Sequence, residues 1–315
     1  MKCVVTGASG LVGRALVASL ARRGDEVTVV TRRPAELPGA AREVVVPDIC
    51  GAEWHAIVPG AEVVYHLAAH VHITDRQKAR DLARFRAVNV DATAALARAC
   101  ATAGTRRLVF MSTVAVHGVE ASEQPLTEAS PLQPVTAYGI SKLEAEEQLR
   151  SAAGSMEWST LRAPLVYGPH VRAKFLQLMR LVDQGLPLPF GRVRNRRSLL
   201  YAGNLVDAMI VVASSPNAAN GTFLVADEET WSTPDLIRAL AADLGVPARL
   251  MPISGSVASR LASIGGARRR LDPLVSSLIL DTSHLRETVG WRPPLPARLG
   301  FRETVRWYRS RSGSA

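Results

Sequence analysis

A glycine-rich turn between a short apolar segment and an amphipathic one constrains the fold of this chain more than any other feature. Residues 2–6 have the pattern of a buried strand, and residues 11–23 have that of a helix. Between them, Gly7, Gly10 and Gly13 permit a tight turn and a close approach of the backbone to a phosphate group. The start of the helix then offers free N–H groups. The pattern therefore predicts the pyrophosphate-binding turn of a dinucleotide-binding domain.

Strand and helix patterns alternate through the first half of the chain, with one helical segment between successive strands. This alternation predicts an α/β fold with a doubly wound parallel Rossmann sheet. It weakens after Gly168, where proline- and glycine-rich segments interrupt the pattern. We expect an NAD(P)-binding domain over residues 1–165 and a smaller mixed α/β substrate domain over 166–315, with roughly 198–226 returning to the first domain.

The end of the second predicted strand indicates which cofactor is bound. An acidic residue at this position would hydrogen-bond the 2′-hydroxyl of NAD, but this chain has Arg32 and Arg33 there. Two guanidinium groups suit a 2′-phosphate in both charge and geometry. We therefore favour NADP(H), with NAD(H) as the alternative cofactor. A solvated basic turn after the strand is the less favoured interpretation of the two arginines.

Further cofactor contacts are expected where later strands end. Asp48 is placed to accept from the adenine amino group, with Ile49 against the ring. The small residues at the end of the fourth strand leave room for the cofactor, and His70 follows them at the carboxyl end, where open α/β sheets bind ligands. The residues assigned to the cofactor in these segments and the glycine turn are Ser9, Leu11, Val12, Leu67, Ala68 and Ala69.

Tyr138 and Lys142 stand four residues apart at the start of a segment rich in helix formers, so their side chains share one helix face. A nearby ammonium favours phenolate, and Lys142 is therefore expected to lower the pKa of Tyr138. Such a tyrosine can exchange a proton with a carbonyl or an alcohol. The spacing alone also occurs by chance in surface helices. Ser112 and Thr113, at the end of the fifth strand, either bind a substrate oxygen or hydrogen-bond the backbone.

The composition of the chain limits the classes of molecule that it is expected to bind. The 315 residues carry a net charge of +10, but the basic residues are scattered and no nucleic-acid motif or aromatic platform accompanies them. We expect an anionic small substrate and no nucleic acid.

No apolar run is long enough to span a bilayer and the start of the chain lacks a signal-peptide pattern, so a cytoplasmic location is expected. The three cysteines show neither metal-ligand nor disulfide spacing, and no metal site is expected.

Five motifs in order make the chain similar to a known family. It resembles an extended short-chain dehydrogenase/reductase of the nucleotide-sugar epimerase/dehydratase/reductase group. The motifs are Thr6-Gly7-Ala8-Ser9-Gly10-Leu11-Val12-Gly13, His66-Leu67-Ala68-Ala69, Ser112-Thr113 with Val116-His117-Gly118, Tyr138 with Lys142, and Leu161-Arg162-Ala163-Pro164 with Tyr167-Gly168-Pro169.

The resemblance implies roles for the matching positions. Tyr138 matches the catalytic acid/base, Lys142 the residue that holds the nicotinamide ribose, and Thr113 the hydroxyl that binds the reacting sugar oxygen. We also assign Asn89, Ser112 and Pro164 to the cofactor site. One departure lies at His117, where the family usually has a tyrosine, and this puts the local packing in doubt.

The second half of the chain resembles nucleotide-sugar enzymes in particular. Pro189 and Phe190 resemble the loop that binds uracil, and Arg197 the arginine that binds the diphosphate. Arg270 lies roughly where a second such arginine occurs, and we assign His70 to the substrate side as well. Many sugar epimerases have asparagine where this chain has Leu165, so one polar contact must differ.

Together with Arg32 and Arg33, this resemblance implies an NADPH-dependent reductase of a UDP-linked 4-keto sugar. The second half of the chain is most like bacterial reductases of 4-keto-6-deoxy amino sugars, which serve surface-polysaccharide synthesis. The alternative is a UDP-hexose 4-epimerase that recycles NAD. A hydroxysteroid or small-aldehyde dehydrogenase is disfavoured, because an uncharged substrate needs no diphosphate arginine. The family also implies a homodimer.

Overall fold

Seven parallel strands form the central sheet of the computed structural model, which describes residues 1–71, 81–119, 121–122, 124–253 and 275–312. The order is β3-β2-β1-β4-β5-β6-β9, and every neighbouring pair is parallel. This confirms the predicted Rossmann-like α/β fold. The strands are β1 (Lys2–Thr6), β2 (Glu26–Thr31), β3 (Arg42–Val45), β4 (Val63–His66), β5 (Arg107–Thr113), β6 (Glu157–Ala163) and β9 (Gly221–Leu224).

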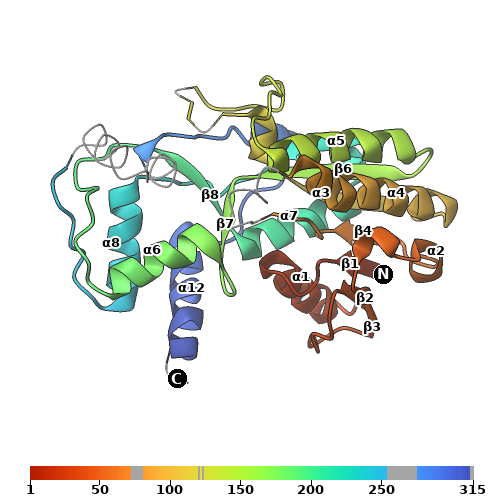
Figure 1. Ribbon diagram of the computed structural model, residues 1–315, viewed down its shortest axis with the longest axis horizontal. Coiled ribbons are helices and arrows are strands. Elements are labelled where there is room, and N and C mark those ends of the chain that lie inside the picture. The colour runs from red at the N-terminus through yellow and green to blue at the C-terminus, as the bar shows by residue number, and fades with distance from the viewer. Residues whose placement is uncertain (72–80, 120, 123, 254–274, 313–315) are drawn as a thin grey trace.

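Helices cover both faces of this sheet (Figure 1), which is why its inner strands are apolar on both sides. One face carries α1 (Leu11–Arg22) and α7 (Ala202–Ser214), which pack on each other. The other carries α2 (Trp54–Ile57), α3 (Leu82–Arg86), α4 (Ala92–Thr102) and α5 (Ala137–Ala152). Two separate apolar clusters fill the two interfaces.

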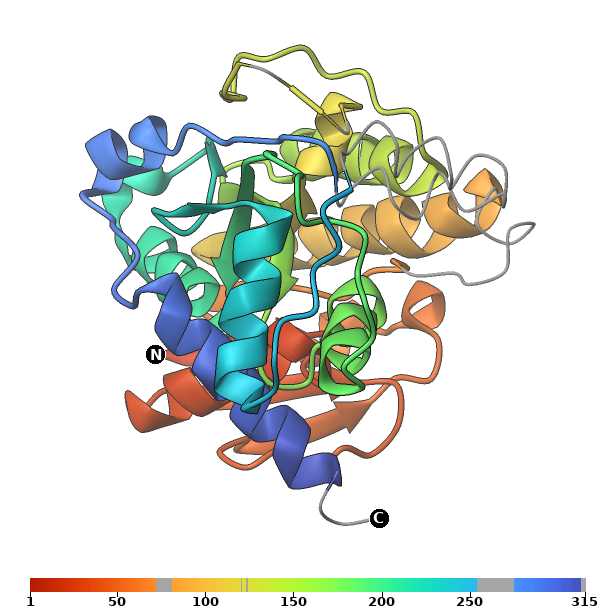
Figure 2. The same ribbon diagram turned by 90° about the vertical axis from the view of Figure 1, so that its left-hand side faces the viewer.

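A smaller unit follows, at the left of Figure 1 and facing the viewer in Figure 2. Its three-stranded sheet has the order β10-β8-β7, and a third apolar cluster joins it to its helices. The elements are β7 (Leu165–Tyr167), β8 (Arg197–Tyr201), β10 (Thr230–Trp231), α6 (Ala173–Asp183), α8 (Thr233–Leu244) and α12 (Ala297–Ser312). The helix α11 (Ser283–Val289) instead contacts β9. Thus α7 and β9 belong with the large sheet, whereas β8 lies in the small one.

The helical segment over residues 82–102 is interrupted. A single π-helical turn, Ala87–Asp91, separates α3 from α4. Such turns insert one extra residue into a helix and are frequent at functional sites. The extra residue changes which side chains face the sheet, and Asn89 on this turn is buried.

The segment before α5 is tied to a segment near the end of the chain. The amide of Ser122 donates to the carbonyl of Ser277 at 2.9 Å, and that of Leu126 to Ile279 at 2.8 Å. The amide of Asp281 returns a bond to Leu126 at 2.8 Å. These backbone pairs hold the path of the chain that leads to Tyr138.

Across the described ranges, no helix combines the length and the apolar character needed to cross a bilayer.

Candidate active site

The carboxyl ends of β1, β4, β5 and β6 meet at one edge of the sheet, because all four strands are parallel and adjacent. This edge brings together the glycine turn after β1, residues 67–70 after β4, and Thr113 at the end of β5. The start of α5, with Tyr138, contacts the short turn Val114–His117 that follows β5. Segments more than a hundred residues apart in the sequence therefore form one site.

The glycine turn has no room for side chains. Gly7 has φ +68°, and a Cβ there would lie 2.7 Å from the amide nitrogen of Ala68. A Cβ on Gly13 would lie 2.4 Å from the carbonyl oxygen of Gly7. Gly10 caps α1 without a side-chain hydrogen bond, and the first turn of α1 holds no acidic residue. The N–H groups of Ser9, Leu11 and Val12 belong to this turn and helix start, which suit a pyrophosphate.

A buried hydrogen-bond chain fixes this turn to β4 and α4. The amide of Ala68 donates to the hydroxyl of Thr6 at 3.2 Å, and that hydroxyl bonds Nδ1 of His66 at 2.7 Å. On the other side, Nε2 of His66 bonds the hydroxyl of Thr93 at 2.9 Å, which donates to the carbonyl of Asn89 at 2.6 Å. Burial lowers the pKa of His66 to about 3, so the imidazole stays neutral and can bridge the two hydroxyls.

Arg32 and Arg33 lie exposed directly after β2, and within the described ranges neither forms an ion pair. Glu43 on β3 shapes this loop by accepting from the hydroxyl of Thr31 at 2.7 Å and the amide of Ala35 at 2.9 Å. The bond from Thr31 lowers the pKa of Glu43. The carboxylate is thus occupied with the loop itself and leaves both guanidinium groups available to an anion.

The remaining segments assigned to the cofactor line the same edge. Asp48 is exposed and caps a short 3-10 turn by accepting from the amide of Cys50, with Ile49 half-buried beside it. Residues 67–69 are half-buried. The Nε2 atom of His70 is buried and has no hydrogen-bond partner among the described residues. A polar atom of this kind at the sheet edge fits a site that completes its bonding with a ligand.

The tyrosine and lysine share one face of α5, as predicted, but their electrostatics differ from the expectation. Burial raises the pKa of Tyr138 to about 12, and a hydrogen bond with Thr113 acts in the opposite direction. Burial also lowers the pKa of Lys142 to about 7. Its Nζ atom lies 3.7 Å from the ring centroid of Phe110. The desolvation of both groups outweighs the attraction that was expected to lower the tyrosine pKa.

Asn89 connects this helix to the end of β4. Its side-chain amide donates to the hydroxyl of Ser141 at 2.9 Å and to the carbonyl of His70 at 3.1 Å, and its oxygen accepts from the amide of His70 at 2.7 Å. Ser141 in turn donates to the carbonyl of Tyr138 at 2.9 Å. The Asn89 side chain thus holds the start of α5 against the segment after β4, and its assignment to the cofactor stays a prediction.

A fully buried carboxylate, Glu146, lies one helical turn beyond Lys142. It accepts from the hydroxyl of Ser112 at 2.5 Å and binds the guanidinium of Arg162 through both oxygens, at 3.1 and 2.7 Å. Arg150 adds a contact at 3.2 Å. The side chain of Ser112 is therefore engaged with α5, and its assignment to the cofactor stays a prediction.

The residues assigned to the substrate are spread over the smaller unit. Arg197 begins β8, and its Nη1 donates to the carbonyl and the hydroxyl of Ser276, each at 3.0 Å. Phe190 is buried in the core of that unit, with Pro189 half-buried next to it. Arg270 lies outside the described residues. Pro164 stands between β6 and β7, before the partly exposed Leu165.

The structure thus gathers Thr113, Tyr138 and Lys142, and their catalytic roles stay predictions. Analysis of the sequence missed the polar support beneath them. It assigned no role to Thr93 and Glu146, and it noted His66 and Arg162 only as parts of motifs. The available signal was the position of Glu146 four residues after Lys142, on the inward face of a helix, where a charged residue needs a partner.

Comparisons with known proteins identify the family of this chain. Residues 3–226 match the model of the NAD dependent epimerase/dehydratase family. The chain is 36% identical to a UDP-glucose 4-epimerase of Vibrio cholerae, over 96% of this chain and 94% of that protein. A structure of MoeE5 in complex with UDP-glucose and NAD is 25% identical with a TM-score of 0.81, covering 99% of this chain and 100% of that one.

A UDP-glucose 4-epimerase of Thermus thermophilus in complex with NAD is also 25% identical, with a TM-score of 0.78, covering 98% of this chain and 99% of that one. The match of the family model spans well over half of the chain and includes the glycine turn, Thr113, Tyr138 and Lys142. The chain is an NAD(P)-dependent enzyme of the extended short-chain dehydrogenase/reductase type, and it belongs to the NAD dependent epimerase/dehydratase family.

Proposed function

We propose that this enzyme reduces the C4 carbonyl of a UDP-linked 4-keto sugar with NADPH. The observation that supports the reaction centre is the convergence of Thr113, Tyr138 and Lys142 at the sheet edge beside the glycine turn. The observation that supports net reduction is the exposed pair Arg32 and Arg33, whose charges suit the 2′-phosphate of NADPH. A net reductase must exchange its cofactor at each turnover and draws on the NADPH pool.

Each group has a defined task in this proposal. Bound NADPH supplies the hydride. Tyr138 keeps its proton until reaction, because its pKa lies near 12, and it donates this proton to the C4 oxygen. Thr113 orients the same oxygen through its hydroxyl. The ammonium of Lys142 stabilises the negative charge that develops on the phenol oxygen.

A second candidate is a UDP-glucose 4-epimerase, favoured by the 36% identity to the Vibrio cholerae protein of that name. The same three side chains can oxidise C4 and reduce it again from the other face. The NAD in the similar structures is consistent with a retained cofactor. This activity consumes no net NADPH.

The number of NADPH molecules consumed per turnover distinguishes the reductase from the epimerase. The enzyme is incubated with NADPH or NADH and a panel of UDP-sugars and their 4-keto derivatives, and products are identified by mass spectrometry. Loss of one NADPH per 4-keto sugar supports the reductase. Interconversion of UDP-glucose and UDP-galactose without a change in absorbance at 340 nm would contradict it and support the epimerase.

A separate experiment tests whether the substrate is linked to a nucleotide diphosphate. A nucleotide-sugar site should bind UDP alone, so UDP is expected to raise the melting temperature with a dependence on its concentration. The variant Arg197→Met should lower the affinity for UDP while keeping that for NADPH. Absence of any shift with UDP in the unmodified protein would count against a nucleotide-linked substrate.

The resemblance further supports a homodimer that acts in the cytoplasm on precursors of surface polysaccharides. Light scattering on the purified protein tests the oligomeric state, since a monomer at micromolar concentration would contradict this part of the proposal.

A further inference from the structure

One buried carboxylate contacts every segment that carries a proposed catalytic group. Glu146 projects from α5, the helix of Tyr138 and Lys142. It accepts from Ser112, the residue before Thr113 on β5. It also binds Arg162 on β6 through both oxygens. The Glu146 side chain has no solvent exposure, and that of Arg162 is 3% exposed. The three contacts fix two strand ends to the catalytic helix.

The network continues to the loop that precedes Tyr138. The guanidinium of Arg162 approaches Nε2 of His117 at 3.5 Å. The Nδ1 atom of His117 faces the carbonyls of Ser130 and Pro131, each at 3.2 Å. These carbonyls require a proton on Nδ1, which leaves Nε2 as the acceptor for Arg162. The histidine that replaces the usual tyrosine thus has a definite bonding role.

Glu146 also acts on the charge of Lys142. Burial lowers the pKa of this lysine, and the carboxylate one turn away opposes the shift. The other groups facing the ammonium are the Phe110 ring on β5, at 3.7 Å, and the neutral imidazole of His66 on β4. Tyr138 lies one helical turn before Lys142 on the same helix. Among these described neighbours, Glu146 is the one that carries a full negative charge.

We propose that Glu146 is a positioning residue that sets the place of Thr113, through Ser112, and increases the fraction of Lys142 that carries its proton. The proposal rests on the roles given above to Thr113 and Lys142. Its two arms are separate: the hydrogen bond to Ser112 acts on geometry, and the negative charge acts on protonation.

The charge arm is tested with Glu146→Gln, which keeps the shape of the side chain and removes its charge. Glu147→Gln is the matched control, because Glu147 is the next residue of α5 and is exposed. The chain contains four lysines, at positions 2, 78, 142 and 174, so protein labelled with carbon-13 at lysine Cε gives few NMR signals. Lys142→Arg identifies the signal of Lys142.

We expect Lys142 to titrate at lower pH in Glu146→Gln than in the unmodified protein, and at an unchanged pH in Glu147→Gln. This measurement needs no substrate, so it remains valid if the proposed reaction is wrong. An unchanged titration of Lys142 in folded Glu146→Gln would overturn the charge arm. With an active substrate, the basic limb of the kcat profile should move to lower pH in the same variant.

The geometric arm is tested with Ser112→Ala, which leaves the ion pair of Glu146 and Arg162 in place and remains available if Glu146→Gln does not fold. We expect kcat to fall roughly tenfold or more, with KM within about twofold, because Thr113 loses its support. The titration of Lys142 should not move. A kcat equal to that of the unmodified enzyme would overturn this arm.

Discussion

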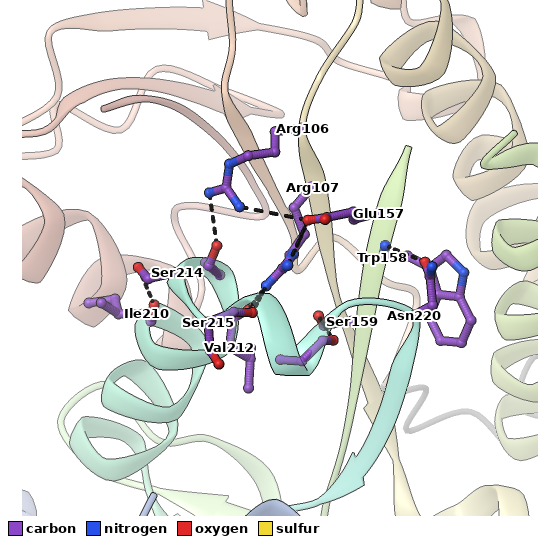
Figure 3. A network of polar contacts seen from close by, with 12 residues as sticks. Arg106, Arg107, Glu157, Trp158, Ser159, Ile210, Val212, Ser214, Ser215 and Asn220 are labelled. Atoms are coloured by element: carbon purple, nitrogen blue, oxygen red, sulfur yellow. Dashed lines mark hydrogen bonds and ion pairs between the residues drawn. The ribbon is translucent and has the colours of Figure 1, made fainter. Parts of the chain in front are cut away.

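A buried arginine is paired with a glutamate at each end of the strand pair β5–β6, and the two ion pairs have different surroundings. At the carboxyl end, Ser112 is the register partner of Arg162, whose charge is enclosed with Glu146. At the amino end, Arg107 is the register partner of Glu157 (Figure 3). Arg107 is fully buried, whereas the Glu157 side chain is 37% exposed.

The amino-end network serves the backbone of α7. Arg107 donates to the carbonyls of Val212 and Ser215, and Arg106 donates to that of Ala213 at 2.9 Å. Carbonyls at a helix end lack partners within the helix and carry partial negative charge, so cations stabilise them. Glu157 holds the Arg107 guanidinium at 3.0 and 2.6 Å. Figure 3 shows these side chains converging on the end of α7.

The difference shows that the surroundings of a buried ion pair decide what the pair contributes. The amino-end pair neutralises a helix end and opens to solvent, so its contribution is to stability. The carboxyl-end pair is closed, touches Ser112, and lies one helical turn from Lys142. Substitutions at the two ends should therefore separate activity from stability.

The largest expected effect lies at the carboxyl end. Tyr138→Phe removes the proposed proton donor and should lower kcat at least about a hundredfold. The melting temperature should stay close to that of the unmodified protein, because the ring remains. Steady-state kinetics and circular dichroism check both statements. Unchanged turnover would remove Tyr138 from the mechanism.

At the amino end we expect the opposite pattern. Arg107→Met should lower the free energy of unfolding by about 2–4 kcal/mol, because buried carbonyls of α7 and the carboxylate of Glu157 lose their donor. Turnover per folded molecule should stay within about twofold. Urea unfolding and active-site titration measure the two quantities. A loss of turnover in fully folded protein would erase the contrast between the ends.

Burial of Lys142 places its ammonium at the proposed reaction centre and lowers the stability of the fold. Its pKa in the folded state, about 7, lies below the ordinary lysine value. The unfolded chain therefore binds more protons above pH 7, and the cost of burying this lysine shrinks as the pH rises from 7 towards that ordinary value. Lys142→Met should abolish activity and stabilise the fold by about 1–3 kcal/mol at pH 6.

The stabilisation by Lys142→Met should be smaller at pH 9 than at pH 6. Melting curves of the variant and the unmodified protein at both pH values test this. Equal stabilisation at the two pH values would show that Lys142 is not desolvated.

The smallest effect is expected for Glu157→Gln. The glutamate is partly exposed, so water screens its charge and the amide still accepts from Arg107. The free energy of unfolding should change by less than about 1 kcal/mol. A loss as large as that of Arg107→Met would show that the amino-end pair is as closed as the carboxyl-end pair.

The sequence was sufficient for the parallel, doubly wound sheet, since the glycine turn and the alternation of elements depend on local periodicity. It also placed Tyr138 and Lys142 on one helix face. It misjudged the pKa of Tyr138, because desolvation depends on packing from several elements. The π-turn at Asn89 and the partners of Glu146 were also inaccessible, since register and distant contacts decide them.

The pairing of residues 122–126 with 277–281 has a consequence for biosynthesis. The loop that precedes Tyr138 acquires its backbone partners from a segment that the ribosome makes long after the loop itself. Domains generally fold as units in the order of their synthesis. The nascent chain can therefore build the first strands of the sheet early, but the loop before Tyr138 gains these backbone partners only once residues 277–281 have left the ribosome.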